Sequence, residues 1–266
     1  MRWTERGLRK VPEITVFFWA VKGLTTAMGE ATSDWSVHAI DPVIAVCLGA
    51  IAFVVAMSLQ LRADRYKPPV YWLAVVMVAV FGTMCADVLH VRFHVPYEVS
   101  TPIFAAVLAG VFVVWHLVER TLSIHSIFTL RRELFYWAAV LSTFAMGTAL
   151  GDLTAYTLHL GFFSSFLLFA VLIAVPALAY RFAGLNAVLA FWSAYVLTRP
   201  LGASLADWLG VPQSLGGLGW GRGTVAILFT IPIVVLVGYL TVSRVDVPLD
   251  QREVGGTGAL ATEPSA

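Results

Sequence analysis

The stretch YWLAVVMVAVFGTMCAD, residues 71–87, contains the pattern that decides the fold. An aromatic residue and a tryptophan open the stretch, a glycine stands ten residues after the tryptophan, and an aspartate stands fifteen residues after it. The residues between are almost all apolar, which is typical of a helix that crosses a lipid bilayer. The same spacing recurs in residues 18–34, 136–152 and 191–207. Four copies of one spacing indicate an internal duplication.

The composition predicts that lipid surrounds most of the chain. Of its 266 residues, 59% are hydrophobic and only 12% are charged, whereas a soluble domain carries about 25% charged residues. A net charge of +1 provides no basic patch, so we expect no nucleic-acid partner. The sequence contains no HExxH, GxSxG or Walker motif, and we expect neither an enzyme nor a resident cofactor.

Eight segments are long and apolar enough to be transmembrane helices, and each copy of the pattern opens an odd-numbered one. The segments are residues 14–35, 41–61, 70–91, 101–118, 134–158, 162–180, 186–208 and 223–243. The predicted fold is an all-α integral membrane protein, a single membrane domain (residues 1–244) of four parallel two-helix repeats. The repeats are residues 11–67, 68–128, 129–183 and 184–244. Residues 245–266 are predicted to form a disordered cytoplasmic tail.

The distribution of basic residues predicts the orientation. With the N-terminus inside, thirteen of the 17 Lys and Arg residues fall on the cytoplasmic side. Arg92 and Arg222 fall outside, and Lys22 and Arg199 fall within spans. Because positively charged loops stay in the cytoplasm, both termini are expected inside.

Two phrases of the repeat, KGLTTAMGEATSD (residues 22–34) and LTRPLGASLAD (residues 197–207), carry a family resemblance. They resemble a bacterial family of uncharacterised membrane-anchored proteins that is defined by a short four-fold repeat of unknown function. The resemblance covers nearly all of the chain except the tail. It implies a multi-pass protein of the bacterial inner (plasma) membrane and a link to acid tolerance or ion balance. It supplies no substrate and no catalytic residues.

The candidate site consists of acids inside the membrane, where ionisable residues usually face a pathway or a partner. These acids are Glu30, Asp34, Asp87, Asp152 and Asp207. If each repeat tryptophan marks the inner aromatic belt, the aspartates lie in the outer third of the bilayer. The alternative places them just past the spans, among the headgroups. Lys22 and Arg199 are expected to tune the charge of the site or to neutralise its acids.

Three kinds of residue accompany the acids. His38, His90 and His159 follow an aspartate, and imidazole with carboxylate suits a transition-metal dication or a proton relay. They could equally be interfacial histidines with no ligand. Each repeat glycine either packs against another helix or marks a helix break. Because Pro200 precedes the fourth glycine, the span of residues 186–208 is the best candidate for a discontinuous helix.

The leading functional hypothesis is a secondary transporter or exporter of a small cation. A divalent metal such as Mn²⁺, bound by the five acids and exchanged for protons, fits the surplus of carboxylates. Transport of H⁺ or another monovalent ion is close behind. The alternative is a membrane scaffold or acid-stress sensor in which the Asp and Gly residues only hold helices together. The expected partners are the lipid bilayer, the cation and protons, and a homo-oligomer is left open.

Overall fold

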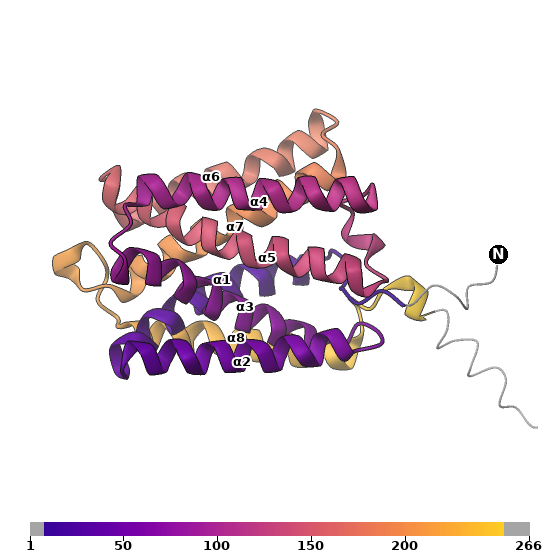
Figure 1. Ribbon diagram of the computed structural model, residues 1–266, viewed down its shortest axis with the longest axis horizontal. Coiled ribbons are helices and arrows are strands. Elements are labelled where there is room, and N and C mark those ends of the chain that lie inside the picture. The colour runs from indigo at the N-terminus through magenta and orange to yellow at the C-terminus, as the bar shows by residue number, and fades with distance from the viewer. Residues whose placement is uncertain (1–7, 253–266) are drawn as a thin grey trace, which may run out of the picture.

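Eight long α-helices make up most of the chain in a computed structural model that describes residues 8–252. The helices lie roughly along one common direction (Figure 1). Their bounds are α1 Val16–Ala39, α2 Pro42–Arg62, α3 Pro68–Asp87, α4 Tyr97–Glu119, α5 Leu130–Asp152, α6 Gly161–Phe182, α7 Ala187–Gly210 and α8 Arg222–Ser243. No strand occurs within the described residues, so the predicted all-α class is confirmed.

Capping side chains set where several helices begin. Thr15, Asp41, Thr129 and Asn186 each accept a hydrogen bond from a backbone N–H in the first turn of the helix that follows. Such residues are preferred at helix starts because they satisfy N–H groups that have no partner within the helix.

Six of the eight helices are long and apolar enough to cross a membrane, which bears out a membrane-embedded protein. The two others are α1 and α7, each 24 residues long. They are long enough but less apolar than the other six, because they carry polar groups, notably Lys22 and Glu30 in α1 and Arg199 in α7. Those three side chains are buried by the neighbouring helices, so they do not face the surroundings of the bundle.

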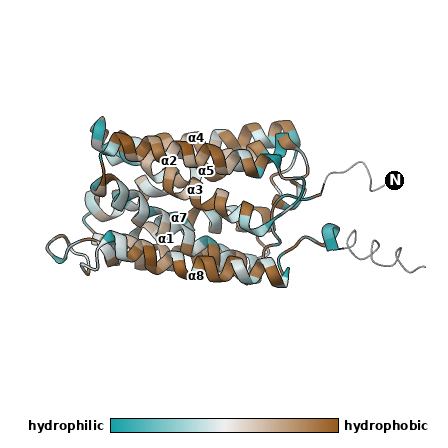
Figure 2. Cartoon of the chain, turned by 90° about the horizontal axis from the view of Figure 1, so that it is seen from below, coloured by the Kyte–Doolittle hydropathy of each residue, from teal (hydrophilic) through white to brown (hydrophobic). Residues whose placement is uncertain are grey.

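The four helices that carry the repeat pattern form a closed inner ring. α1 packs on α3, α3 on α5, α5 on α7, and α7 on α1. α2, α4, α6 and α8 cover this ring by packing mainly on α3, α5, α7 and α1, respectively. Figure 2 shows hydrophobic residues along α2, α4 and α8, and few residues of the four covering helices are buried. The predicted inner layer of Asp-bearing helices is therefore confirmed.

The repeat glycines join the ring by one recurring contact. A Cβ atom on each glycine would touch the residue seven positions after the tryptophan of another copy. The contacts are Gly29 to Ala79, Gly82 to Phe144, Gly147 to Arg199, and Gly202 to Thr26. Each contact links neighbouring inner helices, and the last one closes the ring. Close packing is therefore what these glycines provide.

Substituting Gly202 by alanine is expected to lower the free energy of unfolding by about 1–3 kcal/mol, as overpacking does elsewhere. The added Cβ would lie 2.1 Å from Thr26 Oγ1 and 2.8 Å from the backbone nitrogen of Ala27. Gly23→Ala is the control, because a Cβ at that position would meet no atom within 4 Å among the described residues, apart from the backbone of its own helix and its chain neighbours. Unfolding of the purified protein in mixed detergent micelles measures both. Equal stability of the two variants would contradict the packing role.

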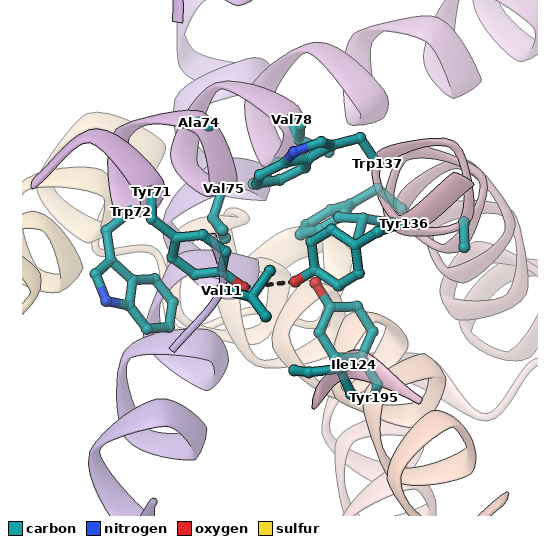
Figure 3. Close-up of a cluster of buried hydrophobic side chains, with 14 of the residues drawn as sticks. Val11, Tyr71, Trp72, Ala74, Val75, Val78, Ile124, Tyr136, Trp137 and Tyr195 are labelled. Atoms are coloured by element: carbon teal, nitrogen blue, oxygen red, sulfur yellow. Dashed lines mark hydrogen bonds between the residues drawn. The ribbon is translucent and has the colours of Figure 1, made fainter. Parts of the chain in front are cut away.

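The repeat aromatic residues gather at one end of the ring. Phe18 contacts Trp72 and Phe191, with ring centroids 5.8 and 5.9 Å apart, and Tyr136 contacts Trp192 at 6.1 Å. The Tyr71 and Tyr136 hydroxyls are hydrogen-bonded at 2.5 Å (Figure 3). The prediction that the tryptophans form a belt at the membrane surface is wrong for Trp72, Trp137 and Trp192. These three are buried and form a plug of aromatic rings in tilted and edge-to-face contact inside the bundle.

A buried glutamate ties the N-terminal segment to the same end of the bundle. Glu133 is fully buried in α5, and Lys10 Nζ lies 2.8 Å from its carboxylate. The Gln60 side chain donates a second hydrogen bond to it at 2.9 Å. These bonds neutralise and satisfy a charge that would otherwise be costly to bury.

Part of the predicted disordered tail is folded onto this end. The Tyr66 hydroxyl donates to the buried Asp246 carboxylate, and Arg9 lies 2.9 Å from Asp250. Burial raises the pKa of Asp246, while the Tyr66 hydrogen bond acts in the opposite direction. Residues 245–252 therefore pack against the bundle, and the rest of the predicted tail, residues 253–266, lies outside the described residues.

Candidate functional site

The four repeat aspartates lie away from the aromatic plug, near the other end of the inner helices. They form two groups together with neighbouring residues. The central group, from the second and third copies, consists of Asp87, His90 and Asp152. The terminal group, from the first and fourth copies, consists of Glu30, Asp34 and Asp207. Within each group, atoms that could bind a cation lie within 4.8 Å of one another.

A serine connects the two groups. The Ser33 hydroxyl, which is fully buried, lies 3.5 Å from Asp87 and immediately precedes Asp34 in α1. The groups are thus neighbours within one ring of helices, so a charge on one group affects the other.

The central group stands where two inner helices change their winding. Asp87 and Asp152 are the last α-helical residues of α3 and α5, and π-helical turns follow at Val88–Arg92 and Leu153–Thr157. Such turns are rare and occur frequently at functional sites. α7, in contrast, remains α-helical through Pro200, so the predicted discontinuity at that proline is wrong. The interruptions are in α3 and α5 instead.

Arg199 is the polar centre of the ring. It is fully buried, and one guanidinium nitrogen bonds Glu30 and the hydroxyls of Thr83 and Thr148, the latter two at 2.6 Å. It therefore joins α7 to α1, α3 and α5. The Nε and the other terminal nitrogen have no hydrogen-bond partner among the described residues. The prediction that Arg199 neutralises an acid agrees with this ion pair.

Lys22 lies between Arg199 and the aromatic plug and has no acidic partner in the described part of the chain. Its fully buried amine stands 4.4 Å from the centroid of the Phe144 ring and 4.3 Å from that of Tyr195. Aromatic faces attract a cation, although less strongly than a carboxylate does. The expectation that Lys22 neutralises an acid directly is therefore not met, and its tuning role stays a prediction.

Arg222 is a site residue that the sequence analysis missed. It opens α8, and its Nε donates to the Asp34 carboxylate at 2.8 Å. The Arg222 and Asp34 side chains are 28% and 19% exposed, so solvent or headgroups reach this edge of the terminal group. Counting basic residues placed Arg222 in an outer loop, and no signal in the sequence linked it to Asp34.

Only one of the three candidate histidines joins an acidic group. His90 belongs to the central group, within the first π-helical turn. His38 is exposed and its ring nitrogen contacts the backbone carbonyl of Asp34, not a carboxylate. His159 is exposed beyond the second π-helical turn, where its backbone has a φ of 54°. The turn of direction there carries its side chain away from Asp152.

A comparison with protein families identifies the repeat. A family model described as a Repeat of Unknown Function (DUF347) matches residues 70–121, 135–185 and 190–246. The chain belongs to the DUF347 repeat family. The matched segments correspond to the second, third and fourth copies of the pattern, and the first copy is not among them. No curated protein and no solved structure matches the chain.

The site formed by the DUF347 copies contains more acidic side chains than basic side chains that pair with them. Glu30 pairs with Arg199 and Asp34 with Arg222, whereas the other three acids form no ion pair within the described residues. Those three are Asp87, Asp152 and Asp207. Inside a bundle, such carboxylates must be protonated, hydrated or neutralised by a bound cation. The carboxylates are therefore chemically suited to hold protons or cations.

Proposed function

We propose that the protein is a secondary transporter of a small cation, most plausibly a divalent metal exchanged for protons. The proposal rests on one observation: two groups of acids lie side by side inside a ring of helices, and three of these acids have no ion-pair partner among residues 8–252. Carboxylates that are expensive to keep inside a bundle are typical of ion pathways.

Charge balance favours a dication as the substrate. Two protonated carboxylates can release two protons and take up one dication, and the net charge of the bundle does not change. A monovalent cation exchanged for one proton is also neutral, but a single carboxylate would suffice for it. The two acids of the central group, Asp87 and Asp152, therefore favour the divalent ion.

The alternative, a scaffold or stress sensor, draws on a different observation. Arg199 and the repeat glycines hold the inner helices together without any ligand. Flux through the purified protein separates the two functions. In proteoliposomes loaded with indicator dyes, we expect uptake of Mn²⁺ from a panel that includes Zn²⁺, Mg²⁺ and Na⁺. A scaffold would produce no flux of any of these ions or of protons above that of protein-free liposomes.

The proposed topology has eight spans, with α1 and α7 crossing the membrane inside the other helices and both termini in the cytoplasm of a bacterium. The length of α1 and α7 supports it, since 24 residues extend about 36 Å at the usual helical rise. The basic loops at the aromatic end support the orientation.

Labelling of single cysteines tests this topology in a variant with Cys47 and Cys85 replaced by serine. A membrane-impermeant maleimide is expected to label Gln213→Cys in intact spheroplasts, and Asp64→Cys only after permeabilisation. Both parent residues are exposed, at opposite ends of the bundle. Labelling of both sites, or of Asp64→Cys alone, in intact spheroplasts would contradict the proposed orientation.

A further inference from the structure

His90 is a buried histidine, and one of its two ring nitrogens forms no hydrogen bond within the described residues. It is 9% exposed, and its Nδ1 is buried with no hydrogen-bond partner within the described part of the chain. Leaving a buried polar atom unpaired is costly, so the exceptions call for a physical reason. A nitrogen of the same ring lies within 4.8 Å of carboxylate oxygens of Asp87 and Asp152.

Ser100, in the first turn of α4, determines which ring nitrogen is free. Its buried hydroxyl lies 2.6 Å from His90 Nε2 and 3.5 Å from the Tyr97 carbonyl oxygen. We assign the hydroxyl as donor to the Tyr97 carbonyl, which only accepts, so that the hydroxyl accepts from Nε2–H. In this tautomer of the neutral imidazole the proton is on Nε2 and the lone pair is on Nδ1. The Tyr97 ring packs on the imidazole, with centroids 4.2 Å apart, and limits its rotation.

We propose that the central group is a binding site for a transition-metal dication of the Mn²⁺, Fe²⁺ or Zn²⁺ class, with His90 Nδ1 and the carboxylates of Asp87 and Asp152 as its protein ligands. This inference rests on the proposed function and deepens it. One imidazole with two carboxylates selects such ions over Mg²⁺ and Ca²⁺, which prefer oxygen ligands alone. Ser100 is a positioning residue, because a partner on the second ring nitrogen fixes a ligating histidine.

The terminal group is built differently and is not part of this metal site. Its Glu30 and Asp34 carboxylates are already bonded by Arg199 and Arg222, so they offer few free lone pairs to a metal. It contains no nitrogen ligand. The four copies thus provide one site for the metal and one neighbouring set of acids, in which Asp207 has no ion-pair partner among the described residues and can take up a proton. Ser33 lies between them.

Pulsed electron paramagnetic resonance of bound Mn²⁺ tests the site on the full-length protein in detergent. We expect echo modulation from ¹⁴N of one imidazole in the wild type. His90→Asn should lose this modulation, and His116→Asn should keep it, because His116 is exposed at the opposite end of α4. Ser100→Ala should keep the modulation and weaken Mn²⁺ binding about tenfold, as loss of the hydrogen-bond partner of a metal-ligating histidine does. Folding of each variant is checked by gel filtration.

The outcomes separate this inference from the proposed function. Absence of ¹⁴N modulation in the wild type, or its persistence in His90→Asn, would overturn the metal site even if Mn²⁺ flux is observed. Modulation that requires His90 would support the site even if no flux occurs, and transport alone would then be refuted. If His90→Asn fails to fold, the wild-type spectrum and the Ser100→Ala affinity still decide the question.

Discussion

Asp152→Asn is expected to reduce divalent-cation flux in proteoliposomes to the background of protein-free liposomes, with the protein still accumulating in the membrane. The amide keeps the shape of the side chain but can neither release a proton nor neutralise a cation. Asp152 forms no ion pair within the described residues, so its replacement leaves no partner charge unpaired. Asp207→Asn, in the terminal group, is expected to have the same effect.

Asp41→Asn is the matched control for this series. Asp41 is exposed and caps the start of α2, and asparagine caps a helix about as well as aspartate. It should retain normal flux. Normal flux in both Asp152→Asn and Asp207→Asn would show that the carboxylates are structural. Failure of these variants to accumulate would favour the scaffold.

Arg199→Met is expected to lower the free energy of unfolding by about 3–5 kcal/mol, the usual cost of leaving one member of a buried ion pair alone. Glu30 would lose its only ion-pair partner in the described structure, and the Thr83 and Thr148 hydroxyls would lose a shared donor. Addition of Glu30→Gln to this variant should recover much of the loss, because the uncompensated charge is then gone.

A double-mutant cycle in mixed detergent micelles measures this coupling between the two positions. The reference variants are the two single replacements, Glu30→Gln and Arg199→Met. We expect the double variant to be more stable than the sum of the single losses predicts. Additive losses would mean that the ion pair contributes no coupling energy, and Arg199 would then matter only through packing against Gly147.

The recurring pattern predicted the inner ring because each of its parts has a packing role in the structure. The tryptophans form the plug, and the glycines form the contacts between neighbouring inner helices. The acids come together because the inner helices run in the same direction and carry their aspartates at the same position. The constant spacing between tryptophan and aspartate in each copy places the aspartates at the same level. This level can therefore be predicted without knowing how the helices pack.

What the sequence could not predict depends on contacts between distant residues. The partnership of Asp34 with Arg222 joins α1 to α8, and that of His90 with Ser100 joins neighbouring segments across a loop. The π-helical turn after Asp87 also could not be predicted from a nearby residue, in the way that a proline predicts a break in a helix. The grouping of the copies matches these features, because the second and third copies have the turns, and the two arginines of the fourth copy bond the acids of the first.

Movement of Mn²⁺ against its own gradient tests the central claim most directly. Proteoliposomes are prepared with equal Mn²⁺ on both sides, and a pH gradient is then imposed with the membrane potential held at zero. Exchange of one dication for two protons predicts that Mn²⁺ accumulates on the more acidic side in the wild type and stays level in Asp152→Asn. An unchanged Mn²⁺ distribution in the wild type, with the protein folded and inserted, would contradict proton-coupled metal transport.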